Sequence, residues 1–200
     1  MKDRFVDIRE AADQKRAEGQ YISAGDGFTR AAFGFISETT YGDDLESGNF
    51  GQFLYCHLSS TLCYRIGGQA QRSKNRYRQG SLIASDLLGY NCDEAALRGL
   101  IKEFEADLKT ISGEEEGGLY QNAIEEYSKA NHLDMWQSEM AFDWVYAFFR
   151  RVGDSSSHQP SDWDVIHRNP IDRADFKENT FGDMVSELIY DGEWDFEKSF

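Results

Sequence analysis

The residues best suited to metal chemistry lie in one short stretch, Cys56-His57 followed by Cys63. Thiolates and imidazoles are preferred zinc ligands, but a structural zinc site uses four of them at short spacings. The stretch contains no C-x-x-C pair, and its two cysteines share one face of a helix. We therefore predict buried, reduced cysteines with no metal and no other cofactor. A metal-binding, small-ligand or enzymatic site at Cys56 and His57 is the alternative.

Motifs for nucleophilic catalysis or nucleotide binding are absent from the sequence. Three serines, Ser155, Ser156 and Ser157, precede His158, but the G-x-S-x-G pattern of a nucleophile elbow does not occur. Neither a G-x-x-x-x-G-K-[ST] phosphate loop nor an H-E-x-x-H zinc motif is present. We predict that the serine-rich stretch is a flexible linker, that there are no catalytic residues, and that the protein is not an enzyme.

One cluster of basic side chains is a candidate for binding. Arg72, Lys74, Arg76 and Arg78 fall within seven residues of one predicted helix. The functional interpretation is a docking site for an acidic peptide or a phosphate group. The simpler interpretation is ion pairing with acidic neighbours, which contributes little to stability at a protein surface.

The overall charge limits the kinds of partner. The chain has 36 acidic and 21 basic residues and a formal net charge of −15. A field of this sign repels nucleic acids and anionic lipid surfaces, so we expect neither as a partner. The acidic composition is similar to that of proteins from salt-loving archaea and favours a halophilic protein. An ordinary acidic cytosolic protein is the alternative.

Targeting signals are also absent. No stretch has the apolar length of a membrane-spanning helix, and the first residues lack the apolar region of a secretory signal. Together with the prediction of reduced cysteines, this favours a cytoplasmic protein that does not enter membranes.

The elements that carry these residues are predicted from a recurring pattern. Steps of three and four residues place one aromatic pair and two small residues on one helical face, after a glycine that suits a tight turn. The pattern occurs at Gly19, Tyr21, Ala24, Phe28 and Ala31, again at Gly118, Tyr120, Ala123, Tyr127 and Ala130, and in degraded form at Gly68, Ala70, Ser73, Tyr77 and Gly80. Small residues flanked by rings indicate closely packed, antiparallel helix pairs.

This pattern resembles the second helix of a tetratricopeptide repeat. The resemblance implies an all-α fold in which antiparallel helix pairs stack as a short right-handed array over residues 1–152. The first-helix Trp and Leu of the family are replaced here by Ile8 and Ala11, and the closing Pro is absent. We expect a terminal helix over about 134–151, and an irregular C-terminal segment, 153–200, with one short helix. An unrelated helical bundle with similar packing is the alternative.

Tetratricopeptide-like proteins generally act as interaction scaffolds, and the resemblance implies a concave groove lined by the first helices. The predicted function is therefore protein–protein interaction with a protein or peptide partner, possibly an acidic one. The oligomeric state stays open. The predicted contact residues are Arg9, Arg16, Tyr55 and Arg65 in the groove, and Arg72 and Arg76 in the basic cluster. The aromatic tail around Trp194 is expected to pack back onto the helices.

Overall fold

A computed structural model of the chain describes residues 4–38, 48–89, 94–114, 117–131 and 140–194. Within these residues the fold is all-α, as expected, and contains no strand. The helices are α1 (Arg4–Ala17), α2 (Tyr21–Glu38), α3 (Gly48–Ile66), α4 (Ala70–Gly89), α5 (Ala95–Ser112), α6 (Leu119–Tyr127), α8 (Met140–Asp154), α9 (Trp163–Arg168) and α10 (Pro170–Asp191). The beginning of the helix predicted over 134–151 lies outside the described residues.

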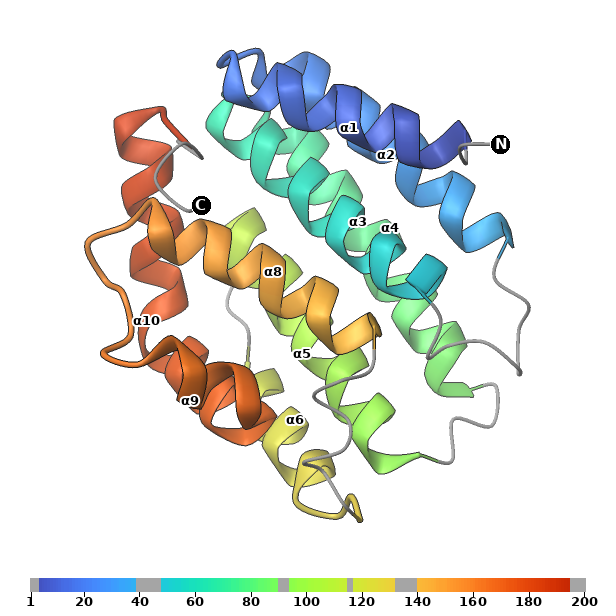
Figure 1. The fold of residues 1–200 in the computed structure, drawn as a ribbon, viewed down its shortest axis with the longest axis vertical. Helices are drawn as coiled ribbons and strands as arrows, with labels where there is room; N and C mark the ends of the chain where they lie inside the picture. Colours follow the sequence, from blue (N-terminus) through green and yellow to red (C-terminus); the bar gives the residue numbers. More distant parts are fainter. Residues whose placement is uncertain (1–3, 39–47, 90–93, 115–116, 132–139, 195–200) are drawn as a thin grey trace.

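Helix α3 is the centre of the molecule. Every residue from 53 to 64 is buried, although the helix carries polar residues on several sides. It packs against α2, α4, α5 and α8, and α10 also contacts it (Figure 1). Helix α10 runs across the direction of these helices on one side of the molecule (Figure 1). The core is therefore built around one enclosed helix.

Three alanines of the recurring pattern are buried between helices, and α1 and α2 approach each other closely beside them. Ala24, Ala31 and Ala123 have no exposed surface. A Cβ atom built on Gly27 would lie 2.8 Å from the Cβ of Ala12, so α1 and α2 touch almost backbone to backbone at this point. The prediction that Ala24, Ala31 and Ala123 face away from water is confirmed.

The glycine that begins each copy of the pattern has a left-handed backbone. The φ angles are 72° at Gly19, 73° at Gly68 and 80° at Gly118. Only glycine adopts this conformation without a steric penalty, and it reverses the chain between two helices. All three copies therefore start at the turn that the sequence predicted.

The packing of α8 on α3 joins helices that are far apart in the chain. In a linear array each unit contacts only its neighbours. The structure thus combines antiparallel pairs, such as α1 with α2, with a later helix that covers the central one (Figure 1). The right-handed tetratricopeptide-like stacking stays a prediction.

The expectation of an irregular C-terminal segment with one short helix is wrong. Residues 163–191 form two helices, and α10 is the longest helix among the described residues, with 22 residues. Pro170 occupies its first turn, where the missing N–H is not needed, and Asn169 accepts a hydrogen bond from the amide of Ile171 at 3.0 Å. Proline therefore begins a helix in a region that was predicted to be irregular.

Candidate functional site

A polar pocket lies between α2 and α4, beside the C-terminal end of α3. Its volume is about 330 Å³. We call it the arginine pocket, and it is lined by Asp26, Thr29, Arg30, Tyr64, Arg72, Asn75 and Arg76. Helices α2 and α4 each supply residues at positions i, i+3 and i+4, which share one helical face. The pocket thus forms where these two faces meet.

One group of residues in the arginine pocket is neutral overall. The hydroxyl of Tyr64 donates to Oδ1 of Asp26 at 2.7 Å, and Arg72 forms an ion pair with the same carboxylate. The guanidinium carbon of Arg72 lies 4.1 Å from the centre of the Tyr64 ring. Partial burial alone would raise the pKa of Asp26, but the hydrogen bonds from Tyr64 and Arg72 outweigh it and lower the pKa. Asp26 therefore stays ionised and compensates one arginine.

The other two arginines of the pocket, Arg30 on α2 and Arg76 on α4, carry positive charge without an ion pair among the described residues. Burial lowers the pKa of Arg76 and the charge of Arg72 lowers it further, while Tyr64 and Asp26 act in the opposite direction. The guanidinium of Arg76 lies 5.7 Å from the ring centre of Phe33, which is 40% exposed. The site offers guanidinium groups next to an exposed aromatic ring.

His57 holds α4 in place beneath Arg76. Its Nε2 lies 2.8 Å from the main-chain carbonyl oxygen of Arg76. Because a carbonyl only accepts, Nε2 carries the proton and donates, and burial lowers the pKa of the ring to about 4. A Cβ atom on Gly80 would lie 3.0 Å from this nitrogen, so glycine makes room for the contact. His57 is a structural residue in this arrangement.

The cysteines near His57 are also part of the core. Cys56 and Cys63 are fully buried, and burial raises the pKa of both thiols. A raised pKa disfavours the thiolate, which is the reactive and metal-binding form. Within the part of the chain that the structure describes, no three His, Cys, Asp or Glu side chains are grouped so as to hold a metal ion.

The basic cluster predicted on α4 is divided between two roles. Arg72 and Arg76 line the arginine pocket, and Arg72 also forms an ion pair with Asp26. Lys74 pairs with Glu114, with 2.9 Å between Nζ and Oε1, so the ion pairs of both Arg72 and Lys74 agree with the simpler interpretation. Arg78 is exposed and does not line the pocket.

The groove residues expected from the resemblance are placed differently. Arg16 is 1% exposed and Tyr55 has no exposed surface, which corrects the expectation that they contact a partner. Both turn inward toward Asp13: the Tyr55 hydroxyl donates to Oδ1 at 3.1 Å, and Nε of Arg16 lies 3.5 Å from the same atom. Aromatic and arginine side chains on this side of α1 pack against each other and fill the expected groove.

The other two predicted groove residues are partly accessible. The side chain of Arg9 is 14% exposed, and its guanidinium lies 4.7 Å from the ring centre of Trp144. Arg65 is half-buried and lies against Gly113 at the end of α5. Neither lines the arginine pocket.

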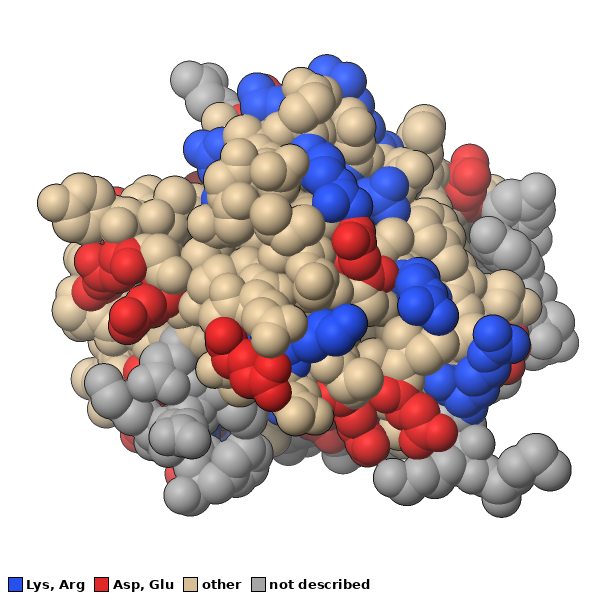
Figure 2. Space-filling model, turned by 90° about the horizontal axis from the view of Figure 1, so that it is seen from above, with Lys and Arg blue, Asp and Glu red and all other residues tan. Residues whose placement is uncertain are grey.

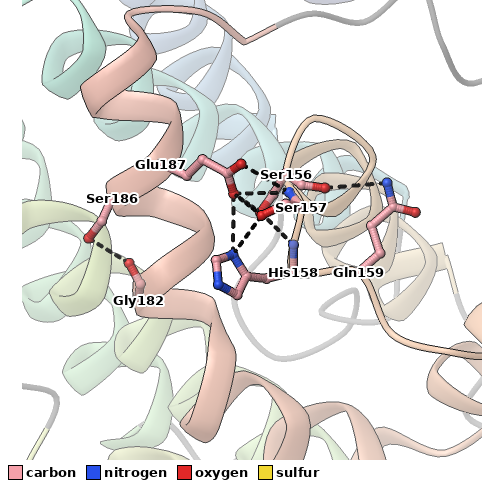
Figure 3. A network of polar contacts seen from close by, with 7 residues as sticks. All are labelled: Ser156, Ser157, His158, Gln159, Gly182, Ser186 and Glu187. Carbon is pink, nitrogen blue, oxygen red and sulfur yellow. Dashed lines mark hydrogen bonds and ion pairs between the residues drawn. The ribbon is translucent and has the colours of Figure 1, made fainter.

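The serine-rich stretch after α8 is anchored by Glu187 (Figure 3). Ser156 donates to this carboxylate at 2.6 Å, the amide of Ser157 donates at 2.9 Å, and Nδ1 of His158 lies 3.2 Å away. Hydrogen bonds from Ser156 and then Ser157 lower the pKa of Glu187 to about 2. Ser157 faces the same histidine nitrogen as Glu187, whereas a catalytic triad uses opposite nitrogens. These hydrogen bonds hold the stretch against α10, so the prediction of a flexible linker is wrong.

A buried ionic cluster, which was not predicted from the sequence, lies between α5 and α10. We define it as Glu103, Asp107, Arg173 and Lys177. Arg173 forms two hydrogen bonds to Glu103, at 2.7 and 2.8 Å, and Nζ of Lys177 lies 2.8 Å from Glu103 and 2.6 Å from Asp107. All four side chains are at most 1% exposed. Two negative and two positive charges therefore compensate each other inside the protein.

Helix α6 completes the ionic cluster with two tyrosines. Tyr127 donates to Glu103 at 2.6 Å, and Tyr120 donates to Asp107 at 2.8 Å. Burial alone would raise the pKa of Glu103, but Arg173 and Lys177 outweigh it and lower the pKa to about 2. Burial and repulsion from Glu103 raise the pKa of Asp107 to about 6. The acids lie four residues apart, as do the bases, and this spacing was the available signal.

Comparison with known proteins adds no further information about the site. No protein-family model, no curated protein and no solved structure matches the chain. None of the described helices combines the length and the apolar character needed to cross a membrane.

Proposed function

We propose that this protein is a protein-binding module that docks an acidic segment of a partner protein in the arginine pocket. The observation that carries the proposal is the surplus of guanidinium groups in a concave site: three arginines line it with one carboxylate, and neither Arg30 nor Arg76 forms an ion pair among the described residues. Such a surplus is unusual in a chain with a net charge of −15. On the face seen from above in Figure 2, Lys and Arg side chains lie together with several Asp and Glu side chains.

The chemistry of the arginine pocket favours a carboxylate-bearing peptide. A guanidinium binds a carboxylate through two parallel hydrogen bonds, and it is less strongly hydrated than an ammonium group. The exposed ring of Phe33 next to Arg76 supplies an apolar contact for a neighbouring side chain. A volume of about 330 Å³ lies near the lower end of the range for small-ligand sites, roughly 300–1,000 Å³. The pocket fits side chains of a peptide better than a large cofactor.

The proposal extends to the setting of the protein. Antiparallel helix pairs such as α1 with α2 support a tetratricopeptide-like scaffold role. The free, buried Cys56 and Cys63 support a reducing, cytoplasmic environment. No observation on the described residues favours a metal site or an enzyme at Cys56 and His57 over this role.

Fluorescence anisotropy with a defined probe tests the proposal. The probe is a labelled peptide of glutamates with one central leucine, at about 0.15 M salt, where the Debye length is about 8 Å. Salt then screens the long-range repulsion from the acidic chain but leaves close contacts. We expect wild-type protein to bind the peptide and the Arg30→Ala, Arg76→Ala double variant to bind at least tenfold more weakly.

Arg78→Ala is the matched control, because Arg78 lies on the same helix, is exposed and does not line the pocket. It removes one positive charge from the surface and should leave the peptide affinity within twofold of wild type. Equal losses in the control and the double variant, or no binding by the wild type, would refute docking at this pocket.

A further inference from the structure

The last described residue, Trp194, is enclosed by the other end of the chain. Helix α10 ends at Asp191, and Gly192 reverses the chain with a φ of 68°. The next residue, Glu193, is exposed, whereas the side chain of Trp194 is only 1% exposed. A short extended stretch therefore leaves the helix and inserts one indole into the protein.

The main chain of Trp194 is held by side chains of α1 and α2. Its N–H donates to the hydroxyl of Tyr21 at 2.7 Å. Its carbonyl oxygen accepts from Nη1 of Arg16 at 3.0 Å. Main-chain bonds of this kind are available to any extended peptide, whatever its sequence.

The indole supplies the specific part of the interaction. Its Nε1 donates to the main-chain carbonyl of Arg151 at 3.3 Å. The guanidinium of Arg16 lies 4.9 Å from the ring centre, and the Phe148 ring packs edge-on at 5.9 Å. We call this enclosure, formed by Arg16, Tyr21, Phe148 and Arg151, the tryptophan slot.

We propose that the tryptophan slot is a peptide-recognition site for an acidic segment with a central tryptophan, which the chain fills with its own C-terminal segment. Two observations support recognition rather than simple core packing. The contacts are those of a bound peptide, two main-chain hydrogen bonds and one buried anchor. The sequence around the anchor is also acidic, Glu193-Trp194-Asp195, and one guanidinium group, that of Arg16, contacts the Trp194 residue that fills the slot.

A matching segment of a partner protein would bind by displacing the chain's own tail. A tail on a short linker has an effective concentration in the millimolar range. A peptide with an intrinsic Kd of about 10 μM would then bind roughly 100-fold more weakly while the slot is filled. This site is separate from the arginine pocket and does not depend on the function proposed for it.

The test uses a fluorescein-labelled peptide of residues 190–200, added to the full chain and followed by anisotropy. In Trp194→Ala the slot is empty, so we expect it to bind the peptide at least tenfold more tightly than wild type. Tyr190→Ala is the matched control, because Tyr190 is 90% exposed near the same end of α10 and its loss leaves the slot filled. The same peptide with alanine in place of tryptophan should not bind. A folded Trp194→Ala protein that does not bind the peptide would overturn the proposal.

A second measurement applies if Trp194→Ala does not fold. A protease site is inserted after Gly192, a position where a Cβ atom would meet no neighbour within 4 Å. After cleavage, the released tail should separate on gel filtration while the helical circular dichroism is retained, and added peptide should rebind. Loss of the helical signal on cleavage would identify Trp194 as an ordinary core residue and overturn the proposal.

Discussion

The ionic cluster and the arginine pocket contain the same kinds of side chain but differ in how their charges are balanced. In the ionic cluster two acids and two bases are buried, and each charged group contacts at least one opposite charge. In the arginine pocket three arginines meet one carboxylate, and the Arg72–Asp26 pair is 42% and 52% exposed. One region is closed and neutral, and the other is open and positive.

This difference separates charges that build the fold from charges that are available to a ligand. A buried charge without a partner costs several kcal/mol, so the ionic cluster persists only because it is complete. At the surface, water solvates the charge and removes much of that cost, so an uncompensated guanidinium is tolerated. We infer that the ionic cluster fixes α5, α6 and α10 relative to each other, while the surplus in the arginine pocket is retained for binding.

Breaking the ionic cluster should have the largest effect on stability. Arg173→Met leaves Glu103 buried with one of its two cations removed. We expect the free energy of unfolding to fall by about 3–5 kcal/mol, measured by urea denaturation. Arg78→Ala, at an exposed position, should change it by less than about 0.5 kcal/mol.

A double variant tests whether the loss comes from the unpaired charge. Combining Glu103→Leu with Arg173→Met removes both members of the pair, so part of the loss should be recovered. If the double variant is less stable than the sum of the two single changes predicts, the cluster does not act through charge compensation.

The second largest expected effect is a change in the free energy of unfolding with pH. The pKa of Asp107 is raised from 3.8 to about 6, so its contribution to stability is complete below 3.8 and is lost as the pH rises through 6. The pKa of Glu103 is lowered from 4.5 to about 2, so its contribution is complete above 4.5 and is lost as the pH falls through 2. Between pH 4.5 and 7.5 only the Asp107 contribution changes within the ionic cluster.

The measurement is the stability difference between wild type and Asp107→Asn. The pKa of His57 is lowered from 6.5 to about 4, so its contribution to the free energy of unfolding increases as the pH rises. In wild type alone, this increase would mask the decrease caused by Asp107. Because both proteins keep His57, its contribution cancels. Relative to Asp107→Asn, the free energy of unfolding of wild type should fall by about 2 kcal/mol between pH 4.5 and 7.5. A constant difference would show that Asp107 does not titrate in this range.

The sequence predicted those features of the two regions that depend only on residues close together in the chain. The helices follow from apolar spacing, and Arg72 and Arg76 were found because one turn of α4 carries both. Asp26 and Arg30 were missed, because the arginine pocket exists only where α2 meets α4. That contact depends on tertiary packing rather than on local sequence.

The ionic cluster was missed for a related reason. Glu103 and Arg173 are 70 residues apart, and acidic residues are so frequent that two more on α5 carried no signal by themselves. The informative feature was position: Glu103 and Asp107 interrupt a run of buried apolar residues that includes Phe104 and Leu108. An acid inside an apolar helical face needs a buried cation from elsewhere in the chain.

A smaller effect links the core to the arginine pocket. In Gly80→Ala the new Cβ would meet Leu108 at 2.3 Å and Nε2 of His57 at 3.0 Å. Overpacking should lower the free energy of unfolding by about 1–3 kcal/mol and displace the backbone at Arg76, which would also weaken acidic-peptide binding. Gly89→Ala, on the same helix with no neighbour within 4 Å of the new Cβ, should affect neither property.

The smallest effect on stability should come from the arginine pocket itself. Asp26→Asn removes the carboxylate that compensates Arg72, but the pair is about half exposed, so the free energy of unfolding should fall by less than about 1 kcal/mol. The positive surplus in the pocket increases by one charge, and the acidic peptide should bind several-fold more tightly, an effect that weakens as salt is added. Thus one carboxylate removed from the open region should improve binding, whereas one cation removed from the closed region should damage the fold. If Asp26→Asn weakens peptide binding, the carboxylate positions Arg72 for the ligand, and the distinction between the two regions fails at this residue.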